Sequence, residues 1–307
     1  MYGNVLITGG TGYLGRALVK RFYDEDVERI CIYSRGEYAQ AVLREAILDP
    51  HDNLRWFIGD VRDKARLRRA MQGIDLVIHT AALKRVEVGE YNPTEMVQTN
   101  VLGTMNVLEA AEDAHVERLV YVSSDKACQP MNAYGATKLV GEKLTLAPIR
   151  GAWSMRCAAV RYGNVAGSTG SVIPTWRALL AAGATAVPVR APQATRFWLT
   201  IQEAVELVLW TADHMLGGEL VVPLMPAYRV GDLAQAMGAA VRLDGGLGTG
   251  EKLDEMMIAP LESPRFRHVP PYLVAGGLAE SLDPNMEGVS TYTLTVDEIR
   301  ERLKEIR

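Results

Sequence analysis

Cysteine and histidine are scarce in this sequence, and neither is arranged to bind a metal ion. The 307 residues include three cysteines and five histidines, and none of them shows the paired spacing of a metal site. We therefore predict that the protein binds no metal. Unpaired, scattered cysteines also fit a reducing compartment, so we expect the protein to be cytoplasmic.

Long apolar runs and clusters of basic charge are absent as well. No run is long and apolar enough to span a bilayer, and the first predicted strand begins at residue 4, which leaves no room for a signal peptide. The formal net charge is −4, and the sequence has no basic stripe. We therefore expect neither a membrane nor a nucleic acid among its partners.

The most specific feature near the N-terminus is a glycine-rich turn. An apolar segment at residues 4–8 leads into Gly9, Gly12 and Gly15, and a helix with one apolar side follows. Glycines at this spacing let the backbone approach a pyrophosphate, which then lies at the N-terminus of the helix. The turn therefore predicts a dinucleotide cofactor. The residues that we expect to contact the cofactor here are Thr8, Gly9, Gly12, Tyr13, Leu14 and Gly15.

The end of the second predicted strand favours NADP over NAD. NAD-selective sites usually carry an acidic residue about 20 residues beyond the glycine motif, whereas this sequence has Ser34 and Arg35. An arginine can hold the 2′-phosphate of NADP, although it could also be a solvated loop residue. The other residues that we assign to the cofactor site are Asp60, Val61, Ala81, Ala82, Lys84 and Asn100.

Strands and helices alternate through about residue 165, which is typical of an α/β protein with a doubly wound parallel sheet, the Rossmann arrangement. We assign residues 1–165, with return segments near 195–226, to an NADP-binding domain. Residues 166–194 and 227–307 are assigned to a smaller C-terminal substrate-binding region. The two parts together have the size of one large domain or two closely joined ones.

Four residues that can handle protons follow the apolar strand predicted at residues 119–122. Asp125 and Lys126 come directly after it, at the edge of the sheet where α/β enzymes place their chemistry. Tyr134 and Lys138 are four residues apart and share one face of a helix. A nearby lysine favours the phenolate, so the tyrosine becomes a useful general base. A plain alcohol dehydrogenase needs one proton transfer, and this set indicates more than one.

Together these motifs resemble the extended short-chain dehydrogenases/reductases, and more narrowly the soluble UDP-N-acetylglucosamine 4,6-dehydratases of the C5-inverting type. Related nucleotide-glucose 4,6-dehydratases usually carry Asp-Glu where this sequence has Asp125 and Lys126. The membrane-anchored, C5-retaining relatives usually have methionine at the position of Tyr134. The resemblance covers nearly the whole chain, in runs that begin at Ile7, Ile32, Phe57, Glu90, Ser124, Tyr134, Arg161, Gly170, Thr195, Gly217 and Gly250.

The resemblance implies proton and hydride transfers at C4, C5 and C6 of the sugar. Tyr134, assisted by Lys138 and Ser124, would take the proton of the 4-hydroxyl group while hydride passes from C4 to NADP. Lys126 would remove the C5 proton, Asp125 would protonate the departing 6-hydroxyl group, and hydride would return to C6. The residues implied to hold the UDP-sugar substrate are Lys84, Asn164, Ser171, Val172, Thr195, Arg196 and Glu251.

The sequence departs from the family at several positions in the substrate-binding half. Arg85 stands where the family usually has histidine, and Gly248 and Thr249 stand where an arginine usually precedes Gly-Glu-Lys. The segment from Arg190 to Ala194 lacks the usual aspartate and methionine. These differences leave the exact sugar, the nucleotide and the stereochemistry at C5 open. Two arginines that could replace the missing phosphate contact, or equally be solvated charges, are Arg190 and Arg242.

Three functions are compatible with the sequence. We favour a sugar-nucleotide 4,6-dehydratase. A sugar-nucleotide 4-epimerase would need Tyr134 and Ser124 but would leave Asp125 and Lys126 without a role. An NADP-sensing protein without enzymatic activity is the third hypothesis, but such proteins tend to lose the Tyr-x-x-x-Lys pair, which this sequence keeps.

We also expect the protein to form a homodimer or a higher homo-oligomer. The helices predicted at residues 93–112 and 134–147 resemble those that pair across a two-fold axis in this family. They carry apolar side chains that could lie in such an interface or could equally pack on the sheet, namely Val107, Leu108, Leu139 and Leu144.

Overall fold

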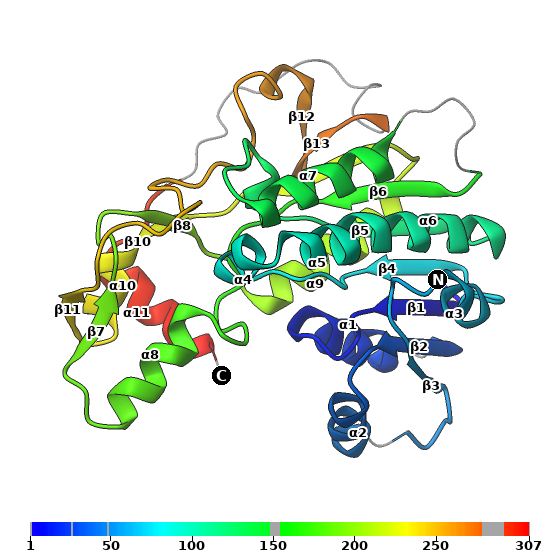
Figure 1. The fold of residues 1–307 in the computed structure, drawn as a ribbon, viewed down its shortest axis with the longest axis horizontal. Helices are drawn as coiled ribbons and strands as arrows, with labels where there is room; N and C mark the ends of the chain where they lie inside the picture. Colours follow the sequence, from blue (N-terminus) through cyan, green and yellow to red (C-terminus); the bar gives the residue numbers. More distant parts are fainter. Residues whose placement is uncertain (1, 26, 48, 148–153, 278–291, 307) are drawn as a thin grey trace.

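The computed structural model describes residues 2–25, 27–47, 49–147, 154–277 and 292–306. A large sheet covered by helices forms one part of the molecule, and a smaller lobe lies beside it, at the left of Figure 1. The fold predicted from the sequence, a doubly wound parallel sheet with a smaller C-terminal part, is confirmed.

The large sheet has nine strands in the order β12-β13-β9-β6-β5-β4-β1-β2-β3. The seven strands from β9 to β3 run parallel, and β13 and β12 extend the sheet in antiparallel pairing. Central strands such as β4 are buried along their whole length, because helices cover both faces of a parallel sheet. The strand bounds are β1 Asn4–Thr8, β2 Arg29–Ser34, β3 Leu54–Ile58, β4 Leu76–His79, β5 Arg118–Val122, β6 Arg156–Val160, β9 Glu219–Pro223, β12 Phe266–Val269 and β13 Tyr272–Ala275.

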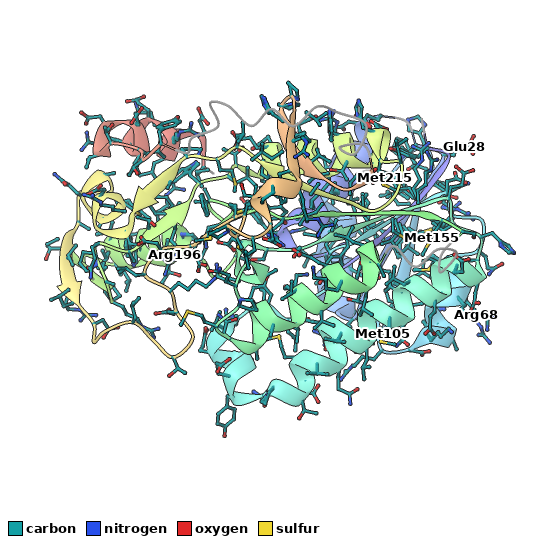
Figure 2. The ribbon with its side chains drawn as sticks, turned by 90° about the horizontal axis from the view of Figure 1, so that it is seen from above. Glu28, Arg68, Met105, Met155, Arg196 and Met215 are labelled. Atoms are coloured by element: carbon teal, nitrogen blue, oxygen red, sulfur yellow. The ribbon has the colours of Figure 1, made fainter. Side chains whose placement is uncertain are left out.

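Helices lie on both faces of this sheet. α1 and α9 pack together on one face, whereas α3, α6 and α7 cover the other. α6 and α7 lie side by side in both views (Figures 1 and 2). The bounds are α1 Tyr13–Asp24, α2 Glu37–Ala46, α3 Lys64–Ala70, α4 Val86–Tyr91, α5 Pro93–Val97, α6 Gly103–Asp113, α7 Ala133–Leu146 and α9 Ile201–His214.

The smaller lobe has its own apolar core, in which Trp176, Trp198, Leu233 and Ile299 are buried. In the described part of the lobe, two short strand pairs and three helices surround this core. β12 and β13 belong to the range that we assigned to the substrate-binding region, but they pair with β9 and so join the large sheet. The elements of the lobe are α8 Val172–Ala181, β7 Ala186–Val189, β8 Thr195–Phe197, β10 Ala227–Arg229, α10 Val230–Ala236, β11 Ala240–Leu243 and α11 Val296–Glu305.

The single helix predicted at residues 93–112 is interrupted. A π-helical turn, η1 (Gln98–Leu102), separates α5 from α6, and the backbone N–H of Gly103 donates to the carbonyl of Gln98. The turn contains Asn100, whose side-chain amide bonds both backbone groups of Leu83 at 2.8 and 2.9 Å. The extra residue in this turn therefore coincides with a tie between the helix and the loop after β4, and π turns often lie at functional sites.

Candidate active site

The carboxyl ends of the parallel strands open into a cleft of about 910 Å³. Its walls come from the turns after β1, β2, β3, β4, β5 and β6 on one side and from the smaller lobe on the other. Arg196, labelled in Figure 2, is one of the lining residues contributed by the lobe. Ligands of open α/β sheets bind at this edge, so we take the cleft as the candidate active site.

The glycine-rich turn forms the floor of the cleft beneath the start of α1. Gly9 has a positive φ of 69°, and a Cβ on Gly15 would lie 2.4 Å from the carbonyl oxygen of Gly9. Neither position accepts a side chain without movement of the backbone. α1 begins after Gly12 without a side-chain cap, so backbone N–H groups at its start are free to bind an anion. The turn therefore fits the pyrophosphate of a dinucleotide.

Thr8 lies behind the turn and does not line the cleft. Its side chain is fully buried, and its hydroxyl lies 2.7 Å from Nδ1 of His79. His79 is packed in the core, where its Nε2 is 3.0 Å from the Thr104 hydroxyl. Burial, helped by the charge of Lys138, lowers the pKa of His79 to about 3, so the imidazole is neutral at physiological pH.

Ser34 and Arg35 line the cleft after β2, together with Asp60 and Val61 after β3. The Arg35 guanidinium is half exposed and lies 3.9 Å from the Asp60 carboxylate. Burial tends to raise the pKa of Asp60, but hydrogen bonds from Arg62 outweigh it and hold the pKa below its usual value. Asp60 is thus mainly engaged with Arg62, which leaves Arg35 accessible to a ligand.

Asp125 and Lys126 form the short 3-10 helix η2 (Asp125–Ala127) directly beyond β5. Asp125 is buried and accepts hydrogen bonds from the Ser124 hydroxyl at 2.7 Å and from Lys126 Nζ at 3.2 Å. Lys126 Nζ also lies 3.5 Å from Glu255. Burial lowers the pKa of Lys126, but the two carboxylates outweigh burial and raise it. The lysine therefore carries a proton in the resting site.

Tyr134 and Lys138 enter the same cleft from α7, one helical turn apart. Burial raises the pKa of Tyr134, against the lowering effects of a hydrogen bond with Ser124 and of the Lys126 charge. We expected Lys138 to lower this pKa, but its ammonium group instead donates to the Val122 carbonyl at 2.5 Å. Burial lowers the pKa of Lys138 to about 7.

Most of the other predicted site residues also line the cleft, and three do not. Ala81, Ala82 and Lys84 lie along it on the loop after β4. Asn100 stands behind this loop and holds Leu83, as described above. On the substrate side, the residues that line the cleft are Asn164, Ser171, Arg196 and Glu251, whereas Val172 and Thr195 do not.

The structure adds residues that the sequence alone did not identify. Glu255 lines the cleft beside Lys126, although it belongs to no recognisable motif. Arg85 also lines the cleft, and a Cβ on Gly170 would lie 3.0 Å from its guanidinium. The sequence marked Arg85 only as a departure from the family. Arg190, considered as a replacement phosphate contact, is paired with Glu251 at 3.1 Å.

In the described ranges, no helix is long and apolar enough to cross a membrane. The same residues contain no cluster of three or more histidine, cysteine, aspartate or glutamate side chains that could hold a metal ion.

The fold and the Tyr-x-x-x-Lys pair beside a glycine-rich turn define an extended short-chain dehydrogenase/reductase. Within this class the chain belongs to the family of polysaccharide biosynthesis proteins, which matches residues 5–275. A Campylobacter jejuni protein named UDP-N-acetylglucosamine 4,6-dehydratase (inverting) is 42% identical over 264 residues, which cover 85% of this chain and 78% of the relative. A Rickettsia akari protein named UDP-glucose 4-epimerase is 39% identical over 76% of this chain and 69% of its own length.

Two solved structures show the same architecture. Pen from Bacillus thuringiensis is 33% identical and superimposes with a TM-score of 0.91 over 99% of this chain and 98% of its own. A dTDP-glucose 4,6-dehydratase from Streptomyces venezuelae, solved with NAD bound, gives a TM-score of 0.75 at 23% identity, over 98% of both chains. The second comparison bears on the fold alone.

Proposed function

We propose that this protein is a sugar-nucleotide 4,6-dehydratase that acts on UDP-N-acetylglucosamine, inverts C5 and uses NADP. The observation that carries the proposal is the placement of Asp125 and Lys126 in one cleft with Tyr134. An acid and a base beside an oxidation site are what water elimination requires. The inverting dehydratase from Campylobacter jejuni, at 42% identity, supports the same activity.

The cleft fits a dinucleotide along the glycine turn. Gly9, Gly12 and Gly15 allow the tight turn that leads the chain into the uncapped start of α1, where a pyrophosphate can bind, and Arg35 is accessible to a 2′-phosphate, which favours NADP. A bound nicotinamide would supply the hydride chemistry that the reaction needs at C4 and C6 of the sugar. The cofactor is regenerated in each turnover, so no external reductant is needed.

Tyr134 is the residue that we assign to the 4-hydroxyl group. Oxidation at C4 requires a base for the hydroxyl proton. Burial raises the pKa of Tyr134, and Ser124 and Lys126 counteract this effect by favouring the phenolate form. Lys138 stands behind the tyrosine on the same helix, held by the Val122 carbonyl. A positioned general base of this kind contributes about 10²- to 10⁴-fold to a rate.

The contact between Asp125 and Lys126 explains how two charged groups can become an acid and a base. At rest the carboxylate accepts a hydrogen bond from the ammonium group at 3.2 Å. Transfer of that proton from Nζ to the carboxylate leaves a free amine on Lys126 and a neutral carboxyl group on Asp125. The amine can then take the C5 proton, which the 4-ketone has made acidic, while Asp125 protonates the departing 6-hydroxyl group.

Three cations of the cleft support binding of a diphosphate. Lys84, Arg85 and Arg196 line it, and within the described residues none of them is ion-paired. Burial and the neighbouring Arg85 lower the pKa of Lys84, as expected where like charges are held together. A nucleoside diphosphate would neutralise this group. We infer that Arg85 offsets the arginine that is missing at Gly248 and Thr249.

The 39% identity to a UDP-glucose 4-epimerase keeps epimerisation as the second candidate. Incubation with UDP-N-acetylglucosamine, followed by mass spectrometry and proton NMR, separates the two. Loss of one water from the sugar supports the dehydratase. A product of unchanged mass would support the epimerase, and no turnover across a panel of nucleotide sugars would contradict both.

We also propose that two copies of the chain pair through α5, α6 and α7. Val107 and Leu108, which we considered for the interface, are buried in the core because they face the sheet. The outer side of these helices and of the π turn η1 instead exposes other apolar side chains. These are Val97, Leu102, Met105 and Val140.

A further inference from the structure

Glu255 is a buried carboxylate of the cleft that the mechanism above leaves without a role. Its side chain is 4% exposed, and Oε1 lies 3.5 Å from Lys126 Nζ. Oε2 has no hydrogen-bond partner within the described part of the chain, although Lys252 Nζ is 3.7 Å away. A buried carboxylate with an unsatisfied oxygen costs free energy, so a stabilising or functional reason is needed for its position.

Buried contacts hold the segment around Glu255 against the catalytic residues. Lys252 Nζ donates to the carbonyl of Cys128, just beyond η2, at 2.6 Å. Two residues after Glu255, the carbonyl of Met257 accepts a hydrogen bond from the fully buried Arg161 at 2.8 Å. The carboxylate is therefore held at a defined place rather than carried on a free loop.

We propose that Glu255 is a positioning residue for Lys126, which holds the ammonium group in the cleft from a second segment of the chain. Asp125 accepts the lysine proton and passes it on to the leaving group, so its charge changes during the reaction. Glu255 takes no part in these transfers and keeps Lys126 in place while Asp125 is neutral. It also favours the ammonium form that must return a proton to C5. This inference rests on the proposed dehydratase function.

The surroundings of Lys126 indicate how the removal of Glu255 should act. Lys126 is faced by Asp125 from its own turn, by Glu255, and by Tyr134 from α7, and all three raise its pKa against burial. The Lys126 charge also acts on Tyr228 of β10, where it opposes the rise in pKa that burial causes. Without the Glu255 charge, the lowering effect of burial on the pKa of Lys126 is less strongly opposed, so the lysine loses its proton at lower pH. The shift expected for an opposite charge at this distance is about 1–3 pH units.

The test is Glu255→Gln, which keeps the shape of the side chain and removes its charge. Two rates are followed against pH with UDP-N-acetylglucosamine: incorporation of solvent deuterium at C5, and single-turnover reduction of bound NADP. We expect the C5 profile to move to lower pH by about 1–3 units, with a lower maximum. The profile of NADP reduction should move less, because Tyr134 serves that step and Lys126 acts on it only through its charge.

Two further variants complete the experiment. Asp254→Asn removes the charge of a neighbouring carboxylate. Asp254 accepts a hydrogen bond from the Thr195 hydroxyl at 2.7 Å and does not face Lys126, so the C5 profile should stay in place. Glu255→Asp keeps the charge and should retain the wild-type profile even if Glu255→Gln folds poorly. An unmoved C5 profile in Glu255→Gln, or equal shifts of both rates, would overturn the proposal. Wild-type protein that never releases water would instead refute the dehydratase function itself.

Discussion

Arg35 is the side chain that we expect to select NADP. Its guanidinium is accessible in the cleft, and its contact with the Asp60 carboxylate is a long one of 3.9 Å. Arg35→Glu should weaken NADP binding by about 1–3 kcal/mol, because a charge-assisted hydrogen bond is replaced by repulsion. Calorimetric titration of the wild type and the variant with both cofactors measures this.

The same change of charge at Arg242, which lies on the exposed strand β11, serves as the control and should leave NADP binding unchanged. A wild-type protein that purifies with NAD and binds NADP no better would contradict the assignment of Arg35.

At the scale of residues, the sequence predicted those parts of the site that lie within short sequence motifs. Gly9 and Gly15 could be predicted because one tight turn dictates both, and Tyr134 and Lys138 because helical spacing places them together. Glu255 could not be predicted, since it reaches Lys126 from a distant segment and only the folded chain brings the two together. Asn100 was assigned to the cofactor site, but its side chain holds the loop after β4 from behind. This too depends on a contact between distant segments.

His79 gives a prediction at the scale of elements, since it joins β4 to Thr8 of β1 and Thr104 of α6. Burial lowers its pKa to about 3 in the folded protein, whereas the unfolded chain binds the proton near pH 6.5. Between these values the unfolded state holds more protons, so the stability from a neutral His79 is present above pH 6.5. It is lost as the pH falls, by at most about 1.4 kcal/mol per pH unit.

Urea unfolding of wild type and His79→Gln at pH 7 and pH 5 tests this prediction. The variant should be less stable at pH 7 and should lose less stability than the wild type on acidification. An identical loss in the two proteins would show that His79 does not titrate in this way.

Among the elements, the strands that precede the site were predicted well because buried parallel strands are continuous apolar runs. β1 has the bounds of the apolar segment expected at residues 4–8. The π turn within the helix at residues 93–112 was missed, since its cause is a tertiary contact of Asn100 with Leu83. The pairing of β12 and β13 with β9 was also not foreseen, because antiparallel return strands at the edge of a sheet carry no local signal.

At the scale of the whole molecule, we expect the chain to be at least a dimer at micromolar concentration. Met105, on the outer side of α6, is 37% exposed, and Val140 of α7 is 41% exposed. Met105→Glu would place a charge in the proposed apolar interface and should shift the assembly towards monomer. Leu261→Glu, at a side chain that is 93% exposed elsewhere, should not. Light scattering measures the mass, and a strictly monomeric wild type would reject the interface.

The central claim is that two residues of one cleft perform different steps: Tyr134 serves the oxidation, and Lys126 serves proton transfer at C5. The most direct measurement compares Lys126→Ala with Tyr134→Phe in the presence of UDP-N-acetylglucosamine and deuterated water. Lys126→Ala should keep bound NADP and reduce a trace of it, but lose water elimination and deuterium incorporation at C5 by at least about 10²-fold. Tyr134→Phe should also block the reduction of NADP. If Lys126→Ala dehydrates the substrate at a rate near that of the wild type, the Asp125–Lys126 pair is structural and the proposed mechanism is wrong.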